Sequence, residues 1–240
     1  MTTHIREGGI CPLVGWQDDF YAYLRALSGR LNQIKVRSKC QAHEVILADA
    51  RSVDFGSRRF QSMLTSPPYP NHRDFTSILL PENTLVSALS EADGFDFSFV
   101  REKIIGSNFV ARLDIRSPKS YVASRFIEEA LSLRRNKRAE YDDEVYYIPY
   151  LKHYFSSLEE AYSNIARFAD TVFEGYVVVV NNTHRGIVIP LSEVVQEIWQ
   201  SLGFRVEVFQ ERELFHVGAK NPRAKGIRAR HTEYVVRIWR

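Results

Sequence analysis

Cysteine and long apolar runs are what this chain of 240 residues lacks most plainly. Cys11 and Cys40 are the only cysteines, so the sequence builds neither a disulfide framework nor a four-cysteine zinc site, and we interpret both as structural thiols. No apolar stretch approaches the roughly 18 to 20 residues that a membrane helix needs. Residues 1–7 also lack the apolar block of a signal peptide. We therefore expect a cytoplasmic protein without a membrane span.

Neither sign of charge dominates the composition. The chain has 32 Lys and Arg against 29 Asp and Glu, a net charge of +3, which allows a nucleic-acid partner without requiring one. Hydrophobic residues make up 45% of the chain and charged residues 25%, as is typical of one large globular domain with a sizeable core. The histidines show no pair at metal-ligand spacing, so we assign no metal site.

The spacing of apolar residues predicts alternating helices and strands in the first and last parts of the chain. A capping-box pattern at Ser157 and Glu160 predicts the start of one helix, and Gly203 is placed to end another. The Val-rich run 176–180 is apolar on both faces, which is typical of a central parallel strand covered by helices on each side. The expected helices span 16–35, 157–172 and 194–202, and the expected strands span 45–48, 60–65, 176–180, 204–209 and 232–239.

The order of these elements predicts an α/β sheet of Rossmann type. Residues 204–209 and 232–239 are expected to form an antiparallel β-ribbon at one sheet edge. Residues 72–145 have scattered charges and few clear strands, so we interpret them as a mostly helical insertion into a domain formed by 1–71 and 146–240. The basic run 134–138 in this insertion is either a solvated helix face or a nucleic-acid contact.

The segment Ser66-Pro67-Pro68-Tyr69 directly follows the predicted strand 60–65. Ligands of open α/β sheets bind beyond the carboxyl ends of the strands. Two consecutive prolines fix φ and remove two backbone donors, which leaves a rigid turn rich in acceptors. The Ser66 hydroxyl and the Pro67 carbonyl can therefore accept the hydrogens of an exocyclic amine on cytosine or adenine. Tyr69 would stack on that base, which must be flipped out of the duplex to be reached.

The run from Thr65 to Asn71 resembles motif IV of the N4-cytosine and N6-adenine DNA methyltransferases. This resemblance implies catalytic roles for Ser66 to Tyr69, a role for Asn71 at the DNA-binding pocket, and direct methyl transfer from S-adenosylmethionine without a metal. Serine at the first position is more common with cytosine N4. Residues 47–51 resemble the family's strand end whose acidic residue contacts the cofactor adenine, so Asp49 takes that role, and Thr65 is assigned to cofactor binding with it.

The family's glycine-rich cofactor loop is missing from the sequence. Phe55-Gly56-Ser57 is the nearest candidate, but a single glycine just before a strand is typical of a connecting turn. The resemblance therefore predicts a split enzyme of a modification or restriction-modification system, in which a second subunit carries the loop. A truncated chain would give the same pattern. Apolar surface is expected where the missing strands would pair.

Several further assignments have a plainer alternative. The loop between the last two strands concentrates basic residues that we expect to contact DNA phosphates, although a merely soluble hairpin tip fits too. For the aromatic cluster 146–155, core packing is favoured over base stacking. The rival functions are methylation of RNA or of a protein glutamine, and a non-catalytic DNA-binding or regulatory subunit. The basic loop residues are Lys220, Arg223, Lys225, Arg228 and Arg230.

Overall fold

The computed structural model divides the chain into two compact units, Met1–Leu47 and Ala48–Arg240. It describes residues 25–26, 44, 46, 48–70, 104–106, 115–132, 143–184, 187–215 and 230–240. In the first unit, the described pair Arg25 and Ala26 is helical, in agreement with the helix expected over 16–35. The rest of that helix lies outside the described residues. The fold can therefore be followed in the second unit.

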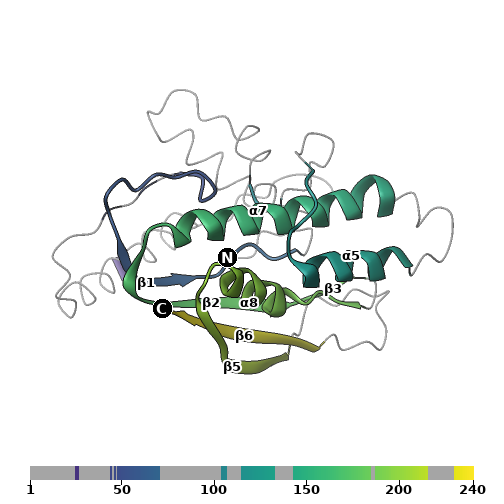
Figure 1. Ribbon diagram of the computed structural model, residues 1–240. Coiled ribbons are helices and arrows are strands. Elements are labelled where there is room, and N and C mark those ends of the chain that lie inside the picture. Colours follow the sequence, from purple (N-terminus) through teal and green to yellow (C-terminus); the bar gives the residue numbers. More distant parts are fainter. Residues whose placement is uncertain are drawn as a thin grey trace. The chain divides into compact units, whose positions relative to one another are not determined.

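The second unit is built on a mixed sheet of four strands (Figure 1). They are β1 (Phe60–Thr65), β2 (Ala169–Asn181), β5 (Arg205–Phe215) and β6 (Arg230–Trp239), in the order β1-β2-β6-β5. Strand β1 is parallel to β2, whereas β6 is antiparallel to both of its neighbours. The predicted antiparallel pair at one edge is thus confirmed as β5 and β6. Strands β3 (Thr183–His184) and β4 (Ile187–Val188) form a separate small pair.

Three α-helices share one buried core with this sheet, and none of the helices in the described part of the chain is long and apolar enough to cross a membrane. They are α5 (Tyr121–Ser132), α7 (Ile148–Ala166) and α8 (Leu191–Ser201), with the π-helical turn η2 (Asp143–Tyr147) leading into α7. Figure 1 shows α7 running alongside β1 and β2. Helix α5, from the expected insertion, joins the same core through its buried apolar side chains.

All three helices cover the same face of the sheet. Successive strand residues point to opposite faces, and the partners Val177 and Val236 are both fully buried against the helices. Trp199 of α8 and Leu158 of α7 belong to the same buried cluster. The opposite face is different: Leu64, Tyr176 and Arg237 stand side by side there, and the Leu64 side chain is 80% exposed. The expectation that helices cover both faces is therefore wrong for the described helices, which cover one.

The boundary between α7 and β2 corrects one prediction. Helix α7 begins at Ile148 rather than at Ser157, because Pro149 occupies its first turn, where a missing N–H costs nothing. Ser157 lies inside the helix and contacts His153, so the predicted capping box is wrong. The helix also ends at Ala166, and residues 169–172 belong to β2, because Ala169 pairs with Phe60 of β1.

The strand expected over 45–48 is not formed at its described residues. Ile46 and Ala48 adopt no regular structure, while Val45 and Leu47 lie outside the described residues. A strand needs a neighbour with which to exchange hydrogen bonds. None of the described strands pairs with this segment, so an apolar run was not sufficient to make one. The strand expected over 60–65 is confirmed with the same bounds as β1. The strands expected over 176–180, 204–209 and 232–239 and the helix over 194–202 are confirmed in kind, with shifted ends.

Candidate active site

The turn Ser66–Tyr69 leaves the sheet at the carboxyl end of β1, where β1 runs parallel to β2. Thr65, half-buried, is the last strand residue and pairs with Val177. Ser66 is exposed, Pro67 is buried, and Pro68 and Tyr69 are half-buried. The prolines therefore seat the turn in the protein while the serine hydroxyl faces solvent, where a ligand can reach it.

Ser66 and Tyr69 are joined across the turn by their side chains. The Ser66 Oγ and Tyr69 Oη atoms lie 2.9 Å apart, and either hydroxyl can be the donor. When Ser66 donates, both lone pairs of its oxygen are free to accept hydrogen bonds from an incoming amine. The predicted acceptor and the predicted stacking residue are thus brought together by the structure.

Tyr154 of α7 forms a hydrogen bond with the same turn from the protein core. Its hydroxyl donates to the Pro68 carbonyl oxygen at 2.6 Å, and the Tyr154 side chain is 0% exposed. Burial, and then the neighbours Tyr162, Tyr150 and Tyr69, raise the pKa of Tyr154 well above its usual value, so the hydroxyl stays protonated. The core packing predicted for this aromatic cluster is confirmed at Tyr150 and Tyr154, but sequence reasoning missed the link to Pro68.

A short piece of the expected insertion also reaches the turn. Gly106 has φ +83°, which favours glycine, and a Cβ placed on it would lie 3.9 Å from Pro68 Cβ. The same position is 3.7 Å from both Tyr150 Oη and Tyr154 Cδ2. Residues 104–106 therefore pack around the Pro68 side of the turn. No motif marked this segment, because a lone glycine among scattered charges carries no such signal.

The Asp49 side chain is bound by Arg51. Its carboxylate accepts hydrogen bonds from the Arg51 backbone N–H at 2.9 Å and from Arg51 Nη2 at 2.7 Å, which raises the pKa of Arg51. Asn164 Nδ2 donates to the Ala50 and Val53 carbonyls at 3.1 and 2.8 Å. Asn164 lies ten residues after Tyr154 in α7, or about 15 Å along the helix axis. Arg51 Nη1 also lies 3.4 Å from Ser157 Oγ, three residues after Tyr154, so the contacts of this segment extend along α7 toward the turn. The cofactor role of Asp49 stays a prediction.

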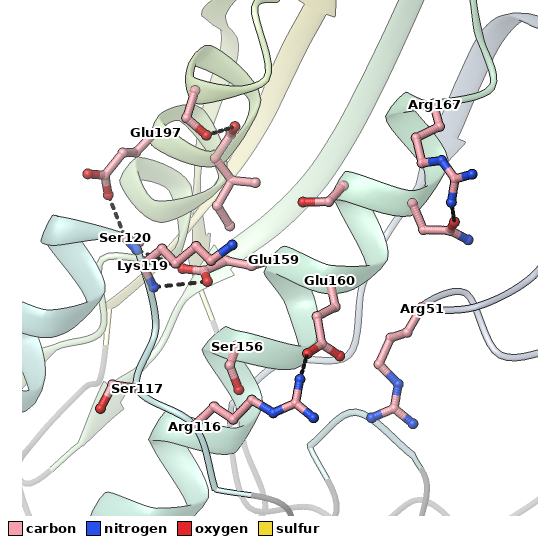
Figure 2. A pocket seen from close by; sticks show the side chains of 14 residues that line it. Arg51, Arg116, Ser117, Lys119, Ser120, Ser156, Glu159, Glu160, Arg167 and Glu197 are labelled. Carbon is pink, nitrogen blue, oxygen red and sulfur yellow. Dashed lines mark hydrogen bonds and ion pairs between the residues drawn. The ribbon is translucent and has the colours of Figure 1, made fainter.

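A cavity of about 600 Å³ lies among α7, α8 and the segment before α5, and none of residues 65–69 lines it (Figure 2). We call the side of α7 that faces this cavity its outer side. Basic and acidic side chains from several elements line it together. Arg116 and Glu160, both largely exposed, form an ion pair at 2.7 Å. Because the charges of both signs are mixed, the cavity favours neither an anionic nor a cationic ligand. Its charged lining residues are Arg51, Arg116, Lys119, Arg167, Glu159, Glu160 and Glu197.

Two of these carboxylates bind backbone groups at the start of α5. Glu159 of α7 accepts hydrogen bonds from the N–H groups of Lys119 and Ser120, at 3.0 and 2.7 Å. Glu197 of α8 accepts from the N–H groups of Tyr121 and Val122, at 2.9 and 3.1 Å, and from the Ser120 hydroxyl. The first N–H groups of a helix lack intrahelical partners, so these contacts satisfy them. These lining residues therefore connect α7 and α8 to the start of α5.

The remaining predicted site residues are only partly visible. Asn71 and four of the five basic loop residues, Lys220, Arg223, Lys225 and Arg228, lie outside the described residues. Arg230 is the first residue of β6 and pairs with Phe215, but its side chain is not described. Gly56, at φ +62°, lies in a turn just before β1, as expected. Within the described ranges, no group of three His, Cys, Asp or Glu side chains could hold a metal ion.

Compared with known proteins, the chain matches no family model, no curated protein and no solved structure. The functional assignment therefore depends on the residues themselves. Those that the structure brings together at one place are Ser66, Pro68, Tyr69 and Tyr154.

Proposed function

We propose that this chain is the base-binding part of a DNA methyltransferase that transfers a methyl group from S-adenosylmethionine to an exocyclic amine, N4 of cytosine or N6 of adenine. The observation that carries the proposal is the Ser66-Pro67-Pro68-Tyr69 turn at the carboxyl end of a parallel strand. Its serine hydroxyl is exposed and hydrogen bonded to the tyrosine of the same turn. The antiparallel pair β5 and β6 at the far edge supports the expected fold class.

In this proposal the turn holds and orients the amine. The two N–H groups of the flipped-out base donate to the Ser66 hydroxyl and the Pro67 carbonyl, while Tyr69 stacks on the ring. Two acceptors in fixed positions direct the nitrogen lone pair out of the base plane, toward the methyl group to be transferred. They also stabilise the positive charge that develops on nitrogen as the N–CH3 bond forms and the S–CH3 bond of the sulfonium breaks. The neutral thioether leaves, and the methylated amine loses one proton to solvent. No residue of the chain needs to form a covalent bond.

The described residues do not by themselves form a methyl-donor site. The sequence has no glycine-rich cofactor loop, and the carboxylate of Asp49, the predicted contact for the cofactor adenine, is bound by Arg51. We place the loop outside these 240 residues, on a second subunit or on further chain. Strand β1 offers a suitable contact, because in the described sheet it pairs only with β2 and its own residue Leu64 is exposed.

The test is made in the source organism, where any partner is present. The chromosomal gene is replaced by a Ser66→Ala variant, and N4-methylcytosine and N6-methyladenine in genomic DNA are measured by mass spectrometry. We expect one of the two modified bases to fall at least about 100-fold, since a misplaced reacting group costs about that much. A matched strain carrying Arg116→Ala, in the separate cavity, should keep the wild-type level.

The same strains, together with a strain in which the gene is deleted, distinguish the rival functions. Unchanged DNA bases with a loss of one methylated RNA base or of methylglutamine in protein would overturn the DNA assignment in favour of that substrate. Loss of DNA methylation on deletion of the gene, but not in Ser66→Ala, would indicate a non-catalytic subunit. Wild-type levels of every methylated product in both strains would refute the methyltransferase proposal.

A further inference from the structure

We infer that Tyr154 is a positioning residue that sets the geometry of the turn Ser66–Tyr69, an inference that rests on the proposed function. Tyr154 lies 86 residues after Pro68 in the chain, yet its hydroxyl donates to the Pro68 carbonyl at 2.6 Å. It is anchored in the middle of the core, among residues of α7 that pack on the sheet. The inference therefore adds to the site a residue outside the sequence motif.

The turn needs a hydrogen-bond donor from elsewhere because it has few of its own. Proline has no N–H, so neither Pro67 nor Pro68 can contribute a backbone donor to hold the loop. The side-chain bond between Ser66 and Tyr69 is exposed, and water competes for it. The bond from Tyr154 is shielded by the core and by the packing of Gly106 against Pro68 and Tyr154. It is therefore the stronger of the two constraints on the turn.

The position of this hydrogen bond decides what it controls. The ring of Pro68 fixes φ, and the following peptide bond is planar, so ψ of Pro68 is the one soft torsion between the proline ring and Tyr69. Rotation about ψ swings the Pro68 carbonyl, which Tyr154 holds. Tyr154 thereby fixes the direction in which Tyr69 leaves the turn, and with it the plane on which a base would stack relative to the Ser66 hydroxyl.

Tyr154→Phe removes only the hydroxyl, and Tyr162→Phe is its matched control. Tyr162 lies on the same helix and is buried, but its hydroxyl has no hydrogen-bond partner within the described part of the chain. We expect Tyr154→Phe to lower kcat for DNA methylation about 10- to 100-fold, with KM for DNA changed less than about threefold, because the base is bound but misaligned. Tyr162→Phe should keep the wild-type kcat and KM.

Both variants are purified as the assembly from the source organism, and their thermal unfolding is measured beside the kinetics. Tyr154→Phe should lower Tm by roughly 2 to 4 °C relative to Tyr162→Phe, because it leaves the half-buried Pro68 carbonyl without its donor. A lower Tm with wild-type kcat would show a merely structural role and overturn the inference, as would equal kcat and equal Tm. Absence of methylation by the wild-type assembly would instead overturn the proposed function, and the positioning role with it.

Discussion

The two sides of α7 make hydrogen bonds of almost equal length that differ in their surroundings. On the inner side Tyr154, whose side chain is fully buried, contacts the half-buried Pro68 at 2.6 Å. On the outer side Glu160 contacts Arg116 at 2.7 Å, but these side chains are 44% and 62% exposed. Solvent competes for the outer pair and screens it, so it contributes little, whereas breaking the inner one leaves a buried group unsatisfied. The length of a hydrogen bond alone therefore does not tell how much it contributes to stability. The weaker of these two contacts is the one beside the cavity.

The largest loss of methylation is expected at Tyr69, in the turn that Tyr154 contacts from the inner side of α7. Tyr69→Ala removes the ring that would stack on the base and should lower methylation about 100-fold, since stacking on an aromatic side chain contributes about 1 to 3 kcal/mol per base. Tyr69→Phe keeps the ring and loses only the hydroxyl bonded to Ser66, so its loss should be about tenfold or less. Methylation assays of the purified assembly check both, and equal rates for the two variants would contradict the stacking role.

Among the side chains that line the cavity, the largest loss of stability is expected at Glu197 of α8. Glu197→Ala leaves the Tyr121 and Val122 N–H groups and the Ser120 hydroxyl without their acceptor. We expect the free energy of unfolding to fall by about 1 to 2 kcal/mol, as for the loss of a helix cap. Glu197→Gln keeps one acceptor oxygen and should lose about half as much. Urea unfolding measures both, and kcat of the folded protein should be unchanged.

Alkaline pH should lower the free energy of unfolding through the buried tyrosines of α7. Burial raises the pKa of Tyr154 and of Tyr162 above the ordinary value of 10.0, so above about pH 10 the unfolded chain releases protons that the folded chain keeps. Stability is therefore fully present below pH 10 and falls as pH rises, by about 1.4 kcal/mol per pH unit for each tyrosine. Urea unfolding between pH 9 and 11 should show a shallower fall in Tyr162→Phe. The same slope in the wild type and in Tyr162→Phe would contradict the raised pKa of Tyr162.

The smallest effect is expected at the exposed ion pair. Arg116→Ala and Glu160→Ala should each change the free energy of unfolding by less than about 1 kcal/mol. A double-mutant cycle should give a coupling energy of a few tenths of a kcal/mol that declines further in high salt. A coupling as large as the effect of Glu197→Ala would show that the outer side is not as weak as its exposure indicates.

Local sequence patterns were enough to predict the strand that carries the turn and the pair at the opposite edge. A β-branched, alternating run such as that of β6 has few other stable conformations, and the Ser66–Tyr69 turn is one contiguous motif. The boundary between α7 and β2 was harder, because Phe168, Ala169 and Val172 fit both helical and extended spacing. Pairing of Ala169 with Phe60 decides it, and that contact joins residues more than a hundred positions apart.

Long-range contacts are also the reason why the support around the site was missed. Tyr154 was predicted as a core residue, which it is, but nothing local shows that its hydroxyl reaches a carbonyl in a distant turn. Gly106 lies in a stretch without any motif, and only its positive φ and its packing on Pro68 give it a role. Asp49 shows the reverse case: its surroundings in the sequence match a family pattern, while the structure engages its carboxylate with Arg51.

The start of α5 has a consequence for the order in which the protein folds. Apart from Ser120, whose hydroxyl accepts from the Ala123 N–H, the groups that satisfy its first turn come from Glu159 and Glu197, 39 to 77 residues away in the chain. A helix of 12 residues is marginal on its own in water. Helix α5 should therefore form only after α7 and α8 have docked, and its amide protons should exchange with solvent before those of the helices that hold it.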